Sequence, residues 1–105
     1  LFGPILPILT VKGIAEAIDF INAREKPLAL YVFSNDNSTV ETVINRCSSG
    51  NACVNDCLVQ EICEGLPYGG VGESGIGRRN EHFTFLEFSH EKAVLKRKQI
   101  GDQIL

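Results

Sequence analysis

The 105-residue sequence lacks several features that would assign it to a broad functional class. It contains no methionine, hence no initiator residue, and we expect it to be a piece of a longer chain. With a net charge of -3 and no basic run, it offers no basic surface for nucleic acid. No apolar stretch approaches the roughly 20 residues of a membrane-spanning helix, so membrane contact is not encoded in this segment. The opening Leu1-Phe2-Gly3-Pro4 also lacks the basic leader and cleavage site of a signal peptide.

Recognisable catalytic and metal-binding patterns are missing too. No Ser/His/Asp set stands out, no two carboxylates have a spacing that assigns acid and base roles, and both histidines are interpreted as surface or arm residues. The four cysteines follow a C-x5-C-x3-C-x5-C spacing, in which only the middle pair fits a zinc pattern. They are Cys47, Cys53, Cys57 and Cys63.

The even number of cysteines permits two disulfides. Against that, Cys47 falls on an apolar helix stripe and Cys53 on an expected buried strand, where cysteine behaves as a small apolar residue. Cys57 and Cys63 fall in an irregular loop with no flanking basic residue to activate a thiolate. We therefore favour structural thiols in a reducing compartment over disulfides or a metal site. This choice predicts an intracellular, cytoplasmic protein without a metal cofactor.

Hydrophobic periodicity predicts an α/β fold with the element order βαβαβ, a parallel sheet and right-handed crossovers. Leu28–Phe33 is apolar at every position, which is typical of a parallel strand buried on both faces. Ser38 and Glu41 form a capping box for the second helix, and Gly50 is expected to stop that helix in a left-handed conformation. The expected elements are strands at Ile5–Val11, Leu28–Phe33 and Ala52–Val54 and helices at Ile14–Ala23 and Ser38–Cys47.

The sequence gives no further regular signal until Phe83, where aromatic and aliphatic residues return. We interpret Phe83–Lys96 as one extended, kinked arm. In a regular strand, Phe83 and Phe85 would share one face and Phe88 would lie on the other. A strand with apolar side chains on both faces is poorly suited to an exposed edge, because such an edge pairs with other chains.

A glycine-rich segment, Gly69–Gly77, holds five of the ten glycines. Within it, Gly70–Gly75 matches the dinucleotide-binding pattern G-x-G-x-x-G, which requires a strand directly before it and a helix after it. Glu64–Pro67 and Arg78–Glu81 meet neither requirement, so we interpret the match as accidental. One alternative for the whole chain is a small α/β module that holds an anion on the backbone N–H groups of Gly69–Gly77.

Several longer motifs stand in a fixed order along the chain, and together they are highly specific. They are Phe2-Gly3-Pro4, Lys26–Phe33 (KPLALYVF), Ser48-Ser49-Gly50, Val54-Asn55-Asp56, Leu66–Gly72 (LPYGGVG) and Phe88-Ser89-His90. In this order they resemble the C-terminal part of the aldehyde dehydrogenase superfamily, and in particular its class 3 branch of fatty and aromatic aldehyde dehydrogenases. The resemblance covers nearly the whole chain, from Phe2 to about Lys96.

The resemblance implies that the parent protein is an NAD- or NADP-dependent enzyme that oxidises aldehydes to carboxylic acids. In this family a cysteine thiolate attacks the aldehyde, hydride passes to the nicotinamide, and a glutamate activates the water that hydrolyses the thioester. Both residues stand upstream of the matched segment, and none of the four cysteines here matches the motif of the nucleophile. The resemblance therefore assigns no catalytic residue to this chain and implies that the chain alone is inactive.

Supporting roles follow from the same resemblance. Phe2 matches the phenylalanine that packs against the nicotinamide riboside, with a core aromatic of the first strand as the alternative. Cys57–Leu66 matches the loop that lines the aldehyde entrance, and Tyr68 replaces the phenylalanine usual after it. Asn55 precedes this loop and either contacts substrate or makes ordinary loop hydrogen bonds. We take Phe2 as the cofactor-binding candidate and Asn55, Cys57 and Tyr68 as the substrate-loop candidates.

The segment Phe83–Leu95 matches the strand that pairs across the family's homodimer. We therefore divide the chain into residues 1–82, an incomplete C-terminal part of the catalytic domain, and residues 83–105, an extended oligomerisation arm and tail. Two segments depart from the family pattern. Arg78–His82 replaces the usual x-Y-H-G-K, with Glu81 at the position of the glycine. Cys57–Glu64 also diverges, which leaves the preferred aldehyde open.

Overall fold

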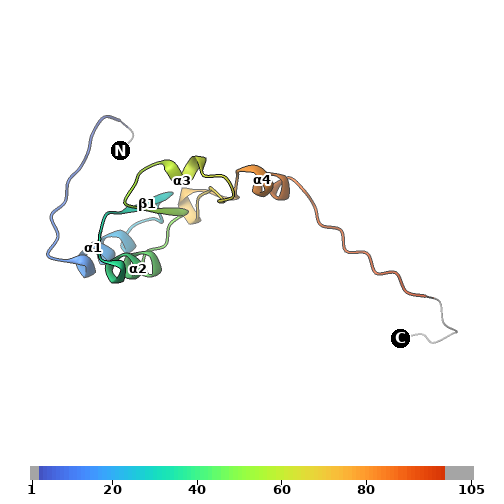
Figure 1. Ribbon diagram of the computed structural model, residues 1–105, viewed down its shortest axis with the longest axis horizontal. Helices are drawn as coiled ribbons and strands as arrows, with labels where there is room; N and C mark the ends of the chain where they lie inside the picture. Colours follow the sequence, from blue (N-terminus) through green and yellow to red (C-terminus); the bar gives the residue numbers. More distant parts are fainter. Residues whose placement is uncertain (1–2, 99–105) are drawn as a thin grey trace.

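The structure is a computed structural model that describes residues 3–98, so the candidate Phe2 lies outside the described residues. It consists of a small α/β body from which two extended segments project (Figure 1). The radius of gyration is 21.1 Å and the longest dimension is 74 Å, whereas a compact domain of this length has a radius of gyration of about 13 Å. The elements are α1 (Ile14–Asn22), β1 (Ala29–Val32), α2 (Asn37–Arg46), β2 (Asn51–Val54), α3 (Val59–Ile62), the 3-10 turn η1 (Gly72–Ser74) and α4 (Glu81–Glu87).

Strands β1 and β2 form a two-stranded parallel sheet, and α2 is the helix that connects them. The register pairs Ala29 with Asn51 and Val32 with Val54. Figure 1 shows α1 and α2 together on one side of the sheet and α3 on the other. The predicted α/β class with a parallel sheet is confirmed, and so are the helix that begins at Ile14 and the two later strands.

The predicted strand at Ile5–Val11 does not form. The segment is extended and exposed, with Ile5 at 62% and Leu6 at 85% exposure. A strand exists only where a neighbour completes its hydrogen-bond ladder, and within residues 3–98 no other segment pairs with this one. In the described part of the chain, the first strand of the expected βαβαβ order is therefore missing and the sheet begins at β1.

The core lies between α1, α2 and the face of β1 that these helices cover. Ile18 of α1 is completely buried and packs in one cluster with Leu30 and Val32 of β1. The predicted burial of both faces of Leu28–Phe33 is wrong, because Tyr31 of β1 is only half-buried and Phe33, just after the strand, is 65% exposed. The remaining core residues are Val40, Val43 and Cys47.

Helix α2 is capped by Asp36. Its carboxylate accepts the N–H of Ser38 at 3.2 Å, the N–H of Thr39 at 3.0 Å and the Thr39 hydroxyl at 2.5 Å. These bonds, led by the Thr39 hydroxyl, hold the pKa of the Asp36 carboxyl below its ordinary value of 3.8. Their contribution to stability is therefore present above pH 3.8 and is lost as the pH falls through the lower folded-state pKa. The predicted capping box of Ser38 and Glu41 is wrong, because Asp36 stands directly before the first helical residue, where it reaches these donors.

Gly50 does not stop α2 in a left-handed conformation. The helix ends earlier, at Arg46, and Gly50 is not among the residues with positive φ. A Cβ atom at Gly50 would lie 2.2 Å from the carbonyl oxygen of Gly69 and 2.8 Å from that of Leu28. Glycine is needed here because three backbone segments meet, and only a residue without a side chain leaves them room.

The extended arm begins later than the predicted Phe83, because Glu81–Glu87 form α4. Residues three apart share one face of a helix. Phe85 and Phe88 accordingly lie on the exposed side, at 70% and 88% exposure, while Phe83 is half-buried. Without a neighbouring strand among residues 3–98, the local helical hydrogen bonds decide the conformation of this segment. Residues 89–98 are extended and exposed, and they form the long projection at the C-terminal end of Figure 1.

Candidate functional site

Asn55 stands at the carboxyl end of the two-stranded sheet. Its φ of 58° is a left-handed conformation that asparagine tolerates. The side-chain Oδ1 accepts the N–H of Ser34 at 2.8 Å, and Nδ2 donates to the Ser34 carbonyl at 3.0 Å. Both ends of the amide are thus bonded to the backbone that follows β1. Asn55 joins the ends of the two strands, and its contact with a substrate stays a prediction.

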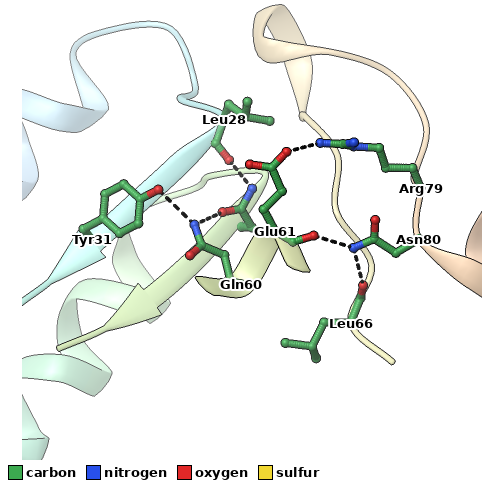
Figure 2. A network of polar contacts seen from close by, with 8 residues as sticks. Leu28, Tyr31, Gln60, Glu61, Leu66, Arg79 and Asn80 are labelled. Atoms are coloured by element: carbon green, nitrogen blue, oxygen red, sulfur yellow. Dashed lines mark hydrogen bonds and ion pairs between the residues drawn. The ribbon is translucent and has the colours of Figure 1, made fainter. Parts of the chain in front are cut away.

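Helix α3 is attached to the sheet by Gln60, a residue that no sequence motif marks. Gln60 is only 7% exposed. Its Nε2 donates to the Tyr31 hydroxyl and to Asn51 Oδ1, both at 3.0 Å (Figure 2). Its Oε1 is buried and has no hydrogen-bond partner among the described residues. Tyr31 lies 29 positions before Gln60, so only the three-dimensional structure brings these groups together.

All four cysteines are free thiols. Cys57 and Cys63, on either side of α3, are exposed, whereas Cys47 is buried in the core. Burial raises the pKa of the Cys47 thiol above its ordinary value, and the nearby positive charge of Arg46 opposes this effect only in part. The N–H of Cys57 donates to Asp56 Oδ1 at 2.7 Å. The group fixed beside Cys57 is thus a carboxylate, and not the cation that activates a nucleophilic thiolate.

The difference in exposure predicts the order in which the thiols react. Iodoacetamide at mildly alkaline pH is expected to label Cys57 and Cys63 at least about tenfold faster than Cys47, which must wait for the core to open. Peptide mass spectrometry over a time course measures the three rates. Equal rates for Cys47 and Cys63 in the folded chain would contradict the burial of Cys47.

Tyr68 begins the glycine-rich loop and is held by an antiparallel bridge to Arg79. The Tyr68 N–H donates to the Arg79 carbonyl at 3.2 Å, and the Arg79 N–H donates back at 2.8 Å. The Arg79 guanidinium lies 4.8 Å from the centroid of the Tyr68 ring. Beyond this bridge the loop folds back on itself, since a Cβ atom at Gly69 would lie 2.1 Å from the carbonyl oxygen of Gly77. The N–H groups of residues 74 and 75 donate to carbonyls within the loop.

The three substrate-loop candidates are spread along β2. Asn55 directly follows the carboxyl end of this strand, whereas the loop that begins at Tyr68 packs on Gly50, just before its amino end. A four-residue strand such as β2 is about 13 Å long. Helix α3, which starts two residues after Cys57, packs against β2, and its Gln60 bonds Asn51 at the amino end of that strand. The structure therefore does not bring the candidates to a single point.

The described residues show neither a metal site nor a dinucleotide site of their own. Residues 3–98 contain no group of three or more His, Cys, Asp or Glu side chains that could hold a metal ion. No strand directly precedes Gly70–Gly75 and no helix directly follows it, and the only regular element inside it is η1. Among the same residues, no helix is both long and apolar enough to cross a membrane.

Comparison with known proteins gives matches over nearly the whole chain. The model of the aldehyde dehydrogenase family matches residues 1–94. Aldehyde dehydrogenase family 3 member B1 of Homo sapiens is 53% identical over 97 residues, which are 92% of this chain and 21% of that protein. Family 3 member F1 of Arabidopsis thaliana is 50% identical over 96 residues, 91% of this chain and 20% of that protein. A solved structure described as the substrate bound state of Staphylococcus aureus AldH superposes with a TM-score of 0.89 at 46% identity, over 97% of this chain and 22% of that chain.

The chain belongs to the aldehyde dehydrogenase family. Both relatives named above are family 3 members, so the resemblance to the class 3 branch is confirmed. The superposition on AldH confirms the α/β fold class. The chain spans about a fifth of the length of the curated relatives that it matches.

Proposed function

We propose that this chain is the C-terminal segment of an NAD- or NADP-dependent aldehyde dehydrogenase that oxidises aldehydes to carboxylic acids. The observation that carries the proposal is the family match over residues 1–94, joined to a TM-score of 0.89 against a substrate-bound AldH. The nucleophilic cysteine and the general-base glutamate belong to the remainder of this parent enzyme. Four free thiols suit a reducing, intracellular compartment, where we place the parent.

The test compares the 105-residue chain with the full-length parent enzyme. The chain alone, mixed with an aldehyde and NAD or NADP, is expected to form no reduced nucleotide, because it carries no catalytic residue. The parent is expected to form reduced nucleotide in proportion to the aldehyde consumed, as followed by absorbance. Turnover by the chain alone would overturn the assignment of the catalytic residues to the rest of the parent. A parent without aldehyde-dependent activity would overturn the proposed function itself.

For the segment from Asn55 to Tyr68 we propose a place at the aldehyde entrance. Helix α3 is attached to the sheet through the buried Gln60. Leu58, just before the helix, and Ile62, its last residue, are 66% and 81% exposed. Exposed apolar side chains on a fixed turn suit the hydrocarbon part of an aldehyde. Asn55, Cys57 and Tyr68 are the proposed substrate-loop residues on this segment.

Binding of NAD or NADP is proposed for the remainder of the parent, together with Phe2. The glycine-rich loop does not fit a dinucleotide, because it follows no strand, opens no helix and bonds the N–H groups of residues 74 and 75 within itself. We therefore assign to the described residues no contact with NAD or NADP and no part in hydride transfer.

We propose that the arm Phe83–Leu95 pairs with a second copy of the parent and forms a homodimer. Four of its apolar side chains are largely exposed: Phe85, Phe88, Val94 at 65% and Leu95 at 92%. The backbone of residues 89–98 is extended, which is the state in which a segment adds to the edge of another sheet. The division into residues 1–82 and 83–105 stays a prediction, and α4 spans its boundary.

A further inference from the structure

Two adjacent residues after the glycine-rich loop, Arg79 and Asn80, hold the end of α3 and the turn that follows it. Asn80 Nδ2 donates to the carbonyl of Glu61 at 3.0 Å and to the carbonyl of Leu66 at 3.3 Å. The Arg79 guanidinium pairs with the Glu61 carboxylate. Figure 2 shows both side chains directed at this segment. We call these residues and their contacts with Glu61 and Leu66 the α3 latch.

The two halves of the α3 latch differ in strength. The side chains of Arg79 and Glu61 are 58% and 39% exposed, and ion pairs this open to water contribute little by themselves. Asn80 is half-buried and donates to two backbone carbonyls. Loss of this donor would leave both carbonyls without that hydrogen bond, which costs more than the loss of an exposed ion pair. Asn80 is therefore the stronger half. The bridge to Tyr68 fixes the backbone of Arg79, so its guanidinium holds the Glu61 side chain in one orientation.

The backbone of the α3 latch is shaped for this contact. Asn80 has a φ of 88° and Glu81 a φ of 42°, both on the left-handed side that most residues avoid. Asparagine adopts such values more readily than other residues with a side chain.

Helix α3 is held from the opposite side as well, by the hydrogen bonds of Gln60 to Tyr31 and Asn51. Residues 61–64, which follow Gln60, form one wall of a cavity of about 340 Å³ that residues 79–81 also line. Ile62, on the first wall, is 81% exposed. Beside the packing of α3 against β2, these two attachments position this wall, because no other described side chain ties α3 to the body by a hydrogen bond.

We propose that Arg79 and Asn80 are positioning residues that set the range of aldehydes accepted by the enzyme. The proposal rests on the proposed function, since it takes the α3 segment to border the aldehyde entrance. A long, uncharged aldehyde reaches the wall that the α3 latch holds, whereas a short one does not. Loss of the latch weakens the contact of a long aldehyde with this wall equally in the ground state and in the transition state. The KM for that aldehyde therefore rises, and its kcat is unchanged.

The experiment uses the full-length parent enzyme with Asn80→Asp or Arg79→Gln. Aspartate keeps the size and the left-handed backbone of Asn80 but cannot donate to the two carbonyls. Arg78→Gln is the matched control, because the Arg78 guanidinium lies 5.5 Å from the Phe83 ring and makes no hydrogen bond or ion pair with the described residues of α3. Hydrogen–deuterium exchange of residues 59–66 reports the attachment of α3. Steady-state kinetics with a long n-alkanal and with acetaldehyde report the substrate range.

Asn80→Asp is expected to speed hydrogen–deuterium exchange of residues 59–66 about tenfold. It is also expected to raise the ratio of KM for the long aldehyde to KM for acetaldehyde about fivefold, with kcat within about twofold of wild type. Arg79→Gln is expected to change the exchange rate and the KM ratio in the same direction but by less. Arg79→Lys, which keeps the positive charge, is expected to stay closer to wild type than Arg79→Gln, and Arg78→Gln is expected to change neither quantity. Unchanged exchange in Asn80→Asp would overturn the α3 latch. Faster exchange with an unchanged KM ratio would overturn its role in substrate range. A wild-type parent that oxidises no aldehyde would instead refute the proposed function, and the exchange data would still decide whether the latch holds α3.

Discussion

Replacing Gly70 with alanine is expected to lower the free energy of unfolding by about 3 kcal/mol or more. A Cβ atom at this position would lie 2.2 Å from the carbonyl oxygen of Ser74, 2.4 Å from its carbonyl carbon and 2.5 Å from the nitrogen of Gly75. All three atoms belong to the backbone, so no side chain can rotate away to make room. The loop has to open or the chain has to shift, and either response breaks contacts that close the loop.

Urea denaturation of the 105-residue chain, followed by circular dichroism, measures this change. Gly13→Ala is the matched control, because a Cβ atom there meets nothing within 4 Å and the φ of 174° suits any residue. The control is expected to cost less than about 1 kcal/mol, as a substitution at an exposed helix start. Equal losses in the two variants would mean that the glycine-rich loop is open rather than closely packed.

Replacing both Phe85 and Phe88 with lysine is expected to convert the proposed dimer of the parent enzyme to monomer at micromolar concentration. The two rings are 70% and 88% exposed and lie three residues apart, Phe85 in the last turn of α4 and Phe88 at its C-cap, where a partner surface would cover them. Two lysines would place two positive charges at the centre of that interface, and a buried unpaired charge opposes association strongly. Sedimentation velocity measures the change in mass.

Ser89→Lys together with Glu91→Lys is the control for charge alone. Both residues are exposed in the same arm, and their replacement adds three positive charges, one more than the Phe85/Phe88 variant, without removing an aromatic ring. This variant is expected to stay mainly dimeric. If the Phe85/Phe88 variant also remains fully dimeric, these rings pack within one chain and the arm is not the interface.

Local patterns predicted the elements whose hydrogen bonds are local, and α1 and α2 are the clearest cases. The apolar repeat that includes Ile18 identifies α1 because the core-facing side of a helix recurs at fixed intervals. The composition of Ile5–Val11 suits a strand equally well, yet no described segment pairs with it. A strand forms only where a second strand supplies the partners for its backbone hydrogen bonds, and the sequence of one segment does not show whether such a partner is present. Asp36 and Ser38 are both good caps by type, and only their positions relative to the first helical turn decide between them.

The candidate site was less accessible to sequence reasoning. The family resemblance pointed to Asn55 and Tyr68, but the backbone partners of these residues became visible only in the folded chain. Gln60 carried no signal at all, because a glutamine in an irregular segment is ordinarily solvated and its partner Tyr31 is far away in sequence. Asn80 was noted only as a departure from a pattern. Its two bonds depend on a left-handed turn that composition does not specify.

The parallel pairing of β1 and β2 has a consequence for the order of folding. Ala29 and its partner Asn51 are only about twenty residues apart, and α2 fills most of that interval. Closing so short a chain costs little entropy, and a helix inside it shortens the distance further. The glycine-rich loop, by contrast, needs a surface made of Gly50 and Leu28 before it has anything to pack on. We expect the β1–α2–β2 unit to be the folding nucleus, with the loop and the segment held by Asn80 docking afterwards as the last and most readily reopened part of the body.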